Sequence, residues 1–284
     1  MSVDISSSPD AAIEGKALLF RTLHTESVLV LPNAWDAASA SVIAAAGATA
    51  IATTSGGVSW SLGRGDGQGL GRREMAEAAR RIVDSVDLPV TVDVERGYGP
   101  APADVAATVR AVIEAGAVGV NLEDSTAVGG PLFDVAEQSA RLRAARDAAE
   151  AAGLPKLFVN ARTDVFLFAI GPADARLGEV LARTEAYAKA GADGIFVPGL
   201  LDLDMLNSLC ARSPLPVNAM AVAGGPSVTE LTQAGVRRIS LGTALAQAAY
   251  TAVREAAAEL LGTGNLTALD GSLDFSELNG LFRH

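Results

Sequence analysis

Cysteine and histidine are almost absent from this chain of 284 residues. Cys210 is the one cysteine, so an intrachain disulfide is excluded, and this usage is typical of proteins from a reducing compartment. The two histidines, His24 and His284, lie away from the places where we expect catalytic side chains to gather. The sequence therefore argues against a zinc site and against a histidine general base.

Long hydrophobic runs and excess positive charge are also missing. The longest nearly apolar stretch, Val42 to Ala52, is too short to cross a bilayer, and the polar start, Met1 to Asp10, is unlike a signal peptide. The net charge of −11 argues against nucleic acid and anionic lipid as partners. A small anionic substrate stays open, because a local arginine and a metal ion can reverse the field inside a pocket. We expect a cytoplasmic protein.

Short apolar runs and Ala-rich amphipathic segments alternate along the chain. The expected strands are Val28–Pro32, Thr49–Thr54, Pro89–Asp93, Gly119–Glu123, Lys156–Ala161, Gly194–Val197, Val217–Ala219 and Arg238–Leu241. The expected helices are Ala37–Ala46, Arg73–Val86, Ala103–Ala115, Val135–Ala152, Ala175–Ala190, Leu203–Ala211, Ser227–Ala234 and Ala244–Leu261. Strict alternation predicts a parallel sheet, and eight units predict one closed (β/α)₈ TIM barrel spanning residues 1–284, with a helical extension over about 244–284.

Polar side chains follow the expected strands, at the end of a barrel where substrates bind. They are Asn33, Ser55–Gly57, Asp93, Glu95, Glu123, Asp124, Asn160, Arg162, Asp164, Asn218 and Gly242–Thr243. Carboxylates thus end the third and fourth strands, and Arg162 ends the fifth. Carboxylates without cysteine or histidine suit Mg²⁺ or Mn²⁺.

Each of these residues also has a simpler interpretation. Asp93 could cap the turn after its strand, and Glu95 with Arg96 could be an exposed pair. Acidic residues 123 and 124 could begin a helix, where they suit the helix dipole. Arg162 could merely neutralise Glu123 or Asp164. Residues 55–57 could be a flexible turn, or their amides could close on an anion.

In order and spacing, the motifs from about residue 29 to 245 resemble those of the isocitrate lyase/phosphoenolpyruvate mutase superfamily. The matching segments are Pro32–Asp36, Thr54–Gly56, Gly65–Gly67, Asp93–Gly99, Asn121–Asp124 and Asn160–Asp164. The resemblance implies an enolate-forming enzyme that uses Mg²⁺, with Mn²⁺ as a substitute. It implies that Asp93 is the direct metal ligand and that Glu95 and Glu123 hold waters of the metal.

The same resemblance assigns further residues to substrate binding and catalysis. The residues expected to contact a small anionic substrate are Ser55, Gly56, Gly57, Asp66, Asn160, Arg162 and Asn218. Arg162 and Glu123 are also the expected catalytic residues, with Tyr98 as the nearest candidate proton donor.

One segment departs from the family pattern. The lyases carry a basic, cysteine-containing segment after the fourth strand, and the phosphonomutases carry a lysine-rich gating loop there. Here residues 125–134 read STAVGGPLFD and contain neither cysteine, lysine nor histidine. We therefore expect little activity on isocitrate or 2-methylisocitrate.

The combined pattern predicts an Mg²⁺-dependent lyase or decarboxylase. It would cleave or form a C–C bond, or a P–C bond, beta to the carbonyl of a small 2-oxo or 2-hydroxy acid through a pyruvate-type enolate. The alternatives are a phosphonomutase and a non-catalytic barrel that binds anions. The apolar helix at 244–261 and the Leu- and Phe-bearing tail after it predict a homo-oligomer, a tetramer built from dimers. The resemblance adds that this helix is exchanged between neighbours.

Overall fold

The computed structural model describes residues 9–282 of the chain, so the predictions for residues 1–8 and for His284 lie outside the described part. The elements in chain order are α1 (Pro9–Glu26), β1 (Leu29–Leu31), β2 (Asn33–Ala34), α2 (Ala37–Ala45), β3 (Ile51–Thr53), α3 (Ser55–Ser61), α4 (Arg72–Ser85), β4 (Val90–Asp93), α5 (Pro102–Glu114), β5 (Gly119–Glu123), α6 (Val135–Ala151), β6 (Phe158–Arg162), α7 (Arg176–Lys189), β7 (Gly194–Phe196), α8 (Leu203–Arg212), β8 (Val217–Met220), α9 (Val228–Gln233), β9 (Arg238–Ser240), α10 (Ala244–Thr263), the 3₁₀ helix η1 (Thr267–Leu269) and α11 (Phe275–Gly280).

All strands run parallel in one sheet whose order is β1-β9-β8-β7-β6-β5-β4-β3-β2. The predicted first strand, Val28–Pro32, contains β1, and β2 follows it after a break at Pro32, because proline has no N–H for the ladder. The Asn33 side chain bridges this break: it donates to the Thr53 carbonyl at 2.9 Å and accepts from the Leu241 amide at 2.8 Å. The sheet therefore closes, which confirms the (β/α)₈ barrel.

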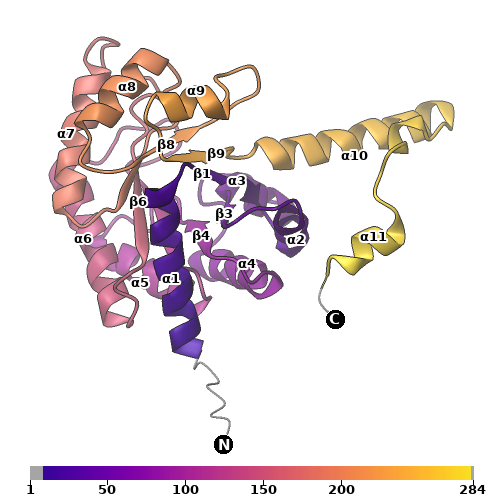
Figure 1. Cartoon of the computed structure of the whole chain (residues 1–284), viewed down its shortest axis with the longest axis horizontal. Coiled ribbons are helices and arrows are strands. Elements are labelled where there is room, and N and C mark those ends of the chain that lie inside the picture. The colour runs from indigo at the N-terminus through magenta and orange to yellow at the C-terminus, as the bar shows by residue number, and fades with distance from the viewer. Residues whose placement is uncertain (1–8, 283–284) are drawn as a thin grey trace, which may run out of the picture.

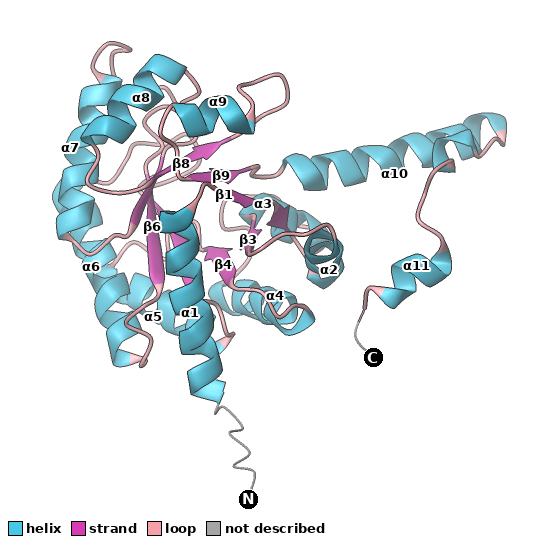
Figure 2. Ribbon diagram, in the orientation of Figure 1, coloured by secondary structure: helices cyan, strands magenta, loops and turns pink. Residues whose placement is uncertain are grey.

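The strands form the inner barrel, and the helices surround it on the outside (Figures 1 and 2). Alternate residues of β5 and β6, such as Leu122 and Ala161, are fully buried under the helices, as expected for strands covered on both faces. Four glycines that end helices before a strand have left-handed backbones, as their repeated Ala-Gly pattern indicates. They are Gly47 (φ 99°), Gly116 (88°), Gly191 (97°) and Gly235 (96°).

Helix α1 packs on the amino-terminal end of the barrel. Its Phe20 lies edge-on to Phe158 of β6 at 5.6 Å, and His24 stacks on the same ring at 3.9 Å. Burial lowers the pKa of His24 to about 3, and the charges of Arg238 and Arg21 add to this effect. His24 is thus a neutral core residue at this end, opposite to the strand ends that carry the carboxylates.

One part of the chain differs from the sequence-based expectation. Residues 55–61 form helix α3, so the interpretation of 55–57 as a flexible turn is wrong. Two glycines in its first turn hid this helix, because glycine is unfavourable in helices by propensity. The Leu- and Phe-bearing tail contains η1 and α11.

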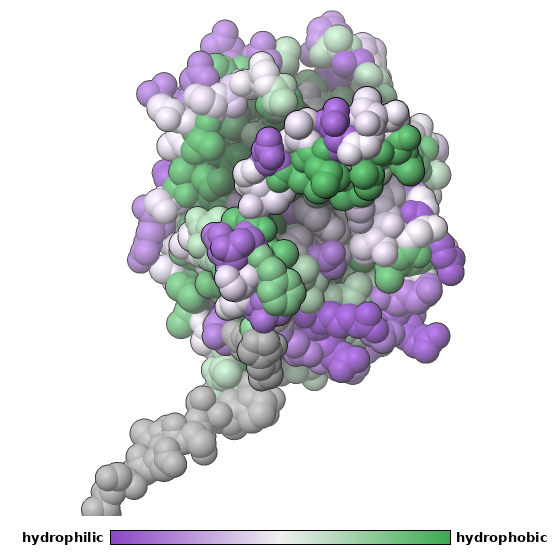
Figure 3. Space-filling view, turned by 90° about the vertical axis from the view of Figure 1, so that its right-hand side faces the viewer, coloured by the Kyte–Doolittle hydropathy of each residue, from purple (hydrophilic) through white to green (hydrophobic). Residues whose placement is uncertain are grey.

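Helix α10 leaves the barrel as an arm, and the chain then turns back so that α11 lies below α10 in the view (Figure 1). Its one buried residue is Ala246, whereas Leu261 and Phe275 further along the arm are each 86% exposed. Figure 3 shows hydrophobic surface on the side of the molecule from which the arm projects. Among the described residues, no helix is long and apolar enough to cross a membrane.

Candidate active site

The predicted catalytic side chains converge because their strands are neighbours in register. Asp93 at the end of β4 pairs with Asn121 of β5, and Glu123 at the end of β5 pairs with Arg162 of β6. Glu123 ends a strand, so the interpretation in which acidic residues 123 and 124 begin a helix is wrong. Asp124 instead points to the helix layer, where its carboxylate accepts from Arg183 at 3.2 Å and from Tyr187 at 2.8 Å.

Arg162 lies between two carboxylates at the mouth of the barrel. Its Nη1 is 3.0 Å from Glu123 Oε2, and its Nε donates to Asp164 Oδ1 at 2.6 Å. Burial disfavours its charged form, but Glu123, Asp164 and Asp93 outweigh this effect and raise the pKa of Arg162. Arg162 therefore does pair with Glu123 and Asp164, as the simpler interpretation expects. Nη2 makes no hydrogen bond or ion pair to residues 9–282, so it is the donor left for a ligand.

The loop after β4 brings a second carboxylate to the site. Glu95 is 3% exposed, and its Oε1 accepts a hydrogen bond from the Tyr98 hydroxyl at 3.1 Å. Burial and the nearby charges of Asp93 and Asp66 raise the pKa of Glu95 to about 7. Burial and the same carboxylates also raise the pKa of Tyr98, so this phenol keeps its proton. The interpretation of Glu95 and Arg96 as an exposed loop pair is therefore wrong.

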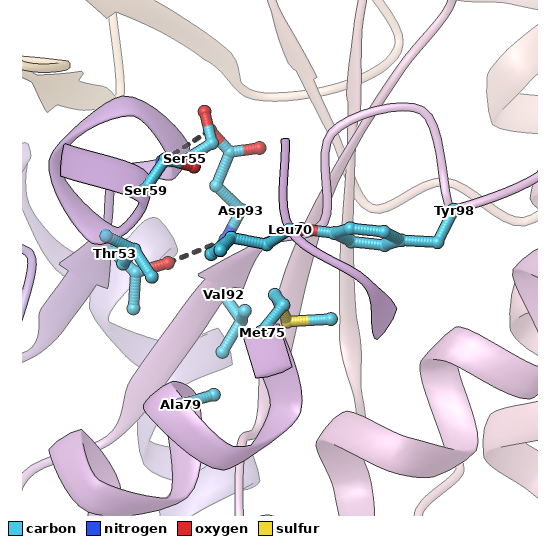
Figure 4. A pocket seen from close by; sticks show the side chains of 10 residues that line it. Thr53, Ser55, Ser59, Leu70, Met75, Ala79, Val92, Asp93 and Tyr98 are labelled. Atoms are coloured by element: carbon cyan, nitrogen blue, oxygen red, sulfur yellow. Dashed lines mark hydrogen bonds between the residues drawn. The ribbon is translucent and has the colours of Figure 1, made fainter. Parts of the chain in front are cut away.

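Asp93 lies between the end of β4 and the first turn of α3 (Figure 4). Its Oδ1 accepts from the Glu95 amide at 3.0 Å, which confirms the turn-capping interpretation, and its Oδ2 is 3.5 Å from the Ser55 amide. Burial raises the pKa of Asp93, although Arg162 opposes this effect. A small cavity beside it is lined by Thr53, Ser55, Asp93 and Tyr98, with apolar side chains below.

Two loops meet above these residues. Residues 125–132 form a short hairpin, in which Ser125 bridges to Leu132. The other loop joins α3 to α4 and contains Gly67. A Cβ at Gly67 would lie 2.5 Å from Val128 Cγ2 of the hairpin, so the two loops are in contact. Arg96 Nη2 donates to the Gly67 carbonyl at 3.0 Å, and its Nη1 is 3.7 Å from Glu123. Arg96 therefore connects the loop that contains Gly67 to Glu123 of the site, a role that the sequence did not indicate.

Other predicted substrate-binding residues lie deeper or serve packing. Asn160 donates to Asn121 at 2.8 Å and to Asn218 at 3.1 Å inside the barrel, and both Asn160 and Asn218 are 1% exposed. A Cβ at Gly57 would lie 2.7 Å from Trp35 Cβ, so close packing alone requires this glycine. Substrate contact by Asn160, Asn218 and Gly57 stays a prediction, because none of the three offers an exposed polar side-chain atom to a ligand.

Gly56 and Asp66 lie closer to the mouth of the barrel. A Cβ at Gly56 would lie 2.8 Å from Thr243 Cγ2 and 3.1 Å from Asp66 Oδ2. The Asp66 carboxylate thus faces the first turn of α3, where the sequence placed the substrate anion. Its negative charge adds to the field that raises the pKa of both Asp93 and Glu95.

The donor set at this face fits a hard divalent cation. Its carboxylates outnumber its guanidinium groups, and those of Asp93, Glu95 and Glu123 all have a pKa raised first by burial. Buried carboxylates with oxygen donors alone are what Mg²⁺ or Mn²⁺ would bind. Within residues 9–282 there is no group of three or more acidic, histidine or cysteine residues arranged to hold a metal directly.

Comparison with known proteins gives the family of this chain. Residues 20–261 match the family model for phosphoenolpyruvate phosphomutase. A solved structure from Burkholderia cenocepacia J2315, described provisionally as a phosphonomutase, is 49% identical with a TM-score of 0.81, covering 84% of this chain and 98% of that one. The structure of a 2,3-dimethylmalate lyase is 29% identical with a TM-score of 0.82, covering 94% of each chain.

A curated relative adds a third reaction. The oxaloacetate decarboxylase of Bradyrhizobium sp. strain BTAi1 is 32% identical over 218 residues, covering 73% of this chain and 68% of the relative. Lyase, decarboxylase and phosphonomutase activities thus occur among proteins similar to this chain. The non-catalytic alternative is not supported, and the chain belongs to the phosphoenolpyruvate phosphomutase family, within the isocitrate lyase/phosphoenolpyruvate mutase superfamily of enzymes.

Proposed function

We propose that this enzyme cleaves the C–C bond beta to the carbonyl of a small 2-oxo dicarboxylate, with decarboxylation of an oxaloacetate-like acid as its simplest reaction. The observation that carries this proposal is the pairing of Arg162 with a surplus of buried carboxylates, beneath a hairpin that has no acid or base of its own. Residues 125–132 contain no titratable side chain. Cleavage of a 2-hydroxy acid needs a base to remove the hydroxyl proton, whereas decarboxylation of a 2-oxo acid does not.

In this reaction the C3–C4 bond breaks, CO₂ leaves, and the bonding electrons move into the enolate of the remaining 2-oxo acid. We assign the enolate or carboxylate of the substrate to Arg162 Nη2, where a charge-assisted hydrogen bond stabilises developing negative charge. The enolate carbon then takes up one proton. The Tyr98 hydroxyl, held at Glu95, is the protein group best placed to deliver it.

We assign a Mg²⁺ ion, or Mn²⁺, to the carboxylates of this face. Asp93 would be its direct ligand, and Glu95 and Glu123 would hold its waters. When bound, the ion would supply Lewis-acid polarisation of the substrate's carbonyl and carboxylate oxygens. Arg162 keeps its charge at working pH because its pKa is raised, so it can bind an anion beside the metal.

Pyruvate release from oxaloacetate, substituted malates and 2-methylisocitrate, together with phosphoenolpyruvate formation from phosphonopyruvate, tests the proposal. We expect turnover of the 2-oxo diacid that requires Mg²⁺ and stops with a chelator, and little turnover of 2-methylisocitrate. Oxaloacetate also decarboxylates with metal alone, so Arg162→Lys with the same metal is the matched blank. Turnover confined to 2-methylisocitrate would overturn the proposal and demand another proton donor.

A phosphonomutase is the second candidate, because the family model and the 49%-identical structure both carry that description. Phosphonopyruvate would then be converted with Mg²⁺, and oxaloacetate would not. The missing lysine in residues 125–134 speaks against it, since a transferred phosphoryl group carries more negative charge than CO₂.

We also propose that the enzyme is a homo-oligomer, a dimer of dimers, in which the arm 244–282 packs on a neighbour. Its support is the exposure of Leu261, Leu266 and Phe275, which a lone arm would leave in water. Light scattering at micromolar concentration should give a mass well above the 28.8 kDa of one chain. A monomer mass would contradict this.

A further inference from the structure

The loop after β4 has a strained backbone where it carries Glu95 into the site. Glu95 (φ 48°) and Tyr98 (φ 56°) both have left-handed conformations, which cost a non-glycine residue roughly 1–3 kcal/mol each. Gly97 (φ 81°) has no room for a side chain, because a Cβ would lie 2.8 Å from Val105. A free loop with this sequence would relax, so other residues must hold it.

Arg141 of α6 is the main support of this loop. Its guanidinium donates to the carbonyls of Arg96, Gly99 (3.0 Å) and Pro100, and its Nε donates to Gln138 at 3.0 Å. Arg141 is 1% exposed, and burial lowers its pKa to about 10. Burying a guanidinium loses its hydration free energy, whereas an apolar side chain at the same position would not. Stability alone is therefore a weak reason for an arginine at this position.

The carbonyls between these contacts are held by two other side chains. Thr108 of α5 donates to the Gly97 carbonyl at 2.8 Å. Arg72 of α4 donates to the Tyr98 carbonyl at 3.1 Å and to the Thr108 hydroxyl at 2.8 Å. Side chains from three successive helices thus hold all five carbonyls from residue 96 to 100.

Arg141 also contacts the end of the hairpin that lies over the site. The ring of Phe133, at the foot of the hairpin, lies under its guanidinium at 4.2 Å. The Phe133 amide donates to the Asp124 carbonyl at 2.8 Å, next to Glu123. One side chain therefore joins the loop that carries Glu95 to the segment that follows Glu123.

We propose that Arg141 is a positioning residue: it holds loop 95–100 in the conformation that turns Glu95 toward the metal, and so raises metal affinity without touching metal or substrate. This inference rests on the metal site proposed above. The competing explanation is that Arg141 is an anchor for the fold and nothing more. Both explanations expect a less stable variant, so stability cannot separate them.

Arg146 provides a matched control on the same helix. Its guanidinium also binds loop carbonyls, those of Gly191, Pro155 and Leu157, but at the amino-terminal end of the barrel. We expect Arg141→Lys and Arg146→Lys both to lower the melting temperature. Outer partners of metal ligands typically change metal affinity by about 10–100-fold. Arg141→Lys should therefore raise the Kd for Mn²⁺ at least tenfold, and Arg146→Lys should change it less than twofold.

The measurements are Mn²⁺ titration calorimetry of the full chain after chelator treatment, and hydrogen exchange of the amides of residues 95–99. Exchange should speed up in Arg141→Lys and stay unchanged in Arg146→Lys. If Arg141→Lys fails to fold, Thr108→Val removes one of the five carbonyl contacts and should raise the Kd by a smaller factor than Arg141→Lys. An unchanged Kd and unchanged loop exchange in the folded variants would overturn the role of Arg141. Absence of Mn²⁺ binding by the unaltered enzyme would sink the metal site as well.

Discussion

At the amino-terminal end of the barrel one carboxylate lies between two arginines, whereas at the carboxyl-terminal end carboxylates outnumber arginines. Asp193 contacts Arg21 at 2.5 Å on one oxygen, and its other oxygen contacts Arg146 and the Val159 amide. At the opposite end, burial raises the pKa of Asp93 and Glu123 although Arg162 opposes this, and burial also raises the pKa of Glu95. The first arrangement is balanced by the residues themselves, whereas the second would be balanced by the cation proposed above.

The backbone repeats this contrast. At the amino-terminal end the left-handed positions before the strands are glycines, such as Gly47 and Gly191, which adopt them freely. At the carboxyl-terminal end, Glu95 and Tyr98 have left-handed backbones although they carry side chains that the site uses. Strain and unbalanced charge thus coincide at one end, as expected where a protein sacrifices stability for function.

The largest expected effect comes from removing the proposed direct metal ligand. Asp93→Ala should abolish Mg²⁺ binding and leave the fold intact, because the pKa of this carboxyl is raised and its charge is unfavourable without metal. Asp93→Asn is the companion variant, since it can still accept from the Glu95 amide and cap the turn. Titration calorimetry with melting curves checks both, and wild-type affinity in either variant would refute the metal assignment.

Arg162→Lys should lower kcat/KM about a hundredfold, which corresponds to about 3 kcal/mol of transition-state stabilisation. A guanidinium can in principle offer two parallel hydrogen bonds to one carboxylate. The structure limits this, because Nε and Nη1 already contact Asp164 and Glu123. Lysine has one ammonium group and cannot bridge both carboxylates and a ligand. Normal turnover with a reduced melting temperature would show that Arg162 serves structure only.

The sequence predicted the barrel and the meeting of Asp93, Glu123 and Arg162 because both follow from periodicity. Parallel strands in register bring consecutive strand ends together, whatever the details of the loops. The break at Pro32 could also have been predicted, since proline cannot donate to a ladder. Helix α3 could not, because its Ser-Gly-Gly start is typical of a turn and only packing against Trp35 and Asp66 makes it a helix.

Long-range contacts explain what the sequence missed at the site. Arg141 is 42 residues from the Gly99 carbonyl that it binds, and Arg96 reaches 29 residues back to Gly67. Arg141 and the exposed Arg143 lie two residues apart on the same helix, and their neighbours in the sequence are similar. Nothing local distinguishes a buried clamp from a solvated arginine, and the distinction depends on the tertiary fold.

At the balanced end of the barrel, Asp193→Asn should lower the free energy of unfolding by about 3 kcal/mol, because it leaves Arg21 and Arg146 without their shared carboxylate. The kcat should stay within twofold of wild type. Asp147→Asn, at an exposed position on α6, is the control, with an expected change below about 0.5 kcal/mol. Urea unfolding and a kinetic assay on the same preparations check this, and a large loss of kcat would break the contrast between the two ends.

The smallest expected effect is a pH dependence at His24. Its pKa falls from 6.5 when unfolded to about 3 when folded, so the unfolded chain binds the extra proton first. The stability that His24 contributes is complete above pH 6.5 and is lost as the pH falls toward 3. By pH 5 the loss should reach about 2 kcal/mol. His24→Phe keeps a ring against Phe158 but cannot gain a charge, so it should lack this loss. The acidic groups of the active site titrate in both proteins alike, and the difference between their urea-unfolding curves at pH 7 and pH 5 therefore isolates His24. Parallel pH dependence in the two proteins would mean that His24 is not held neutral, and that the amino-terminal end also contains a group sensitive to physiological pH.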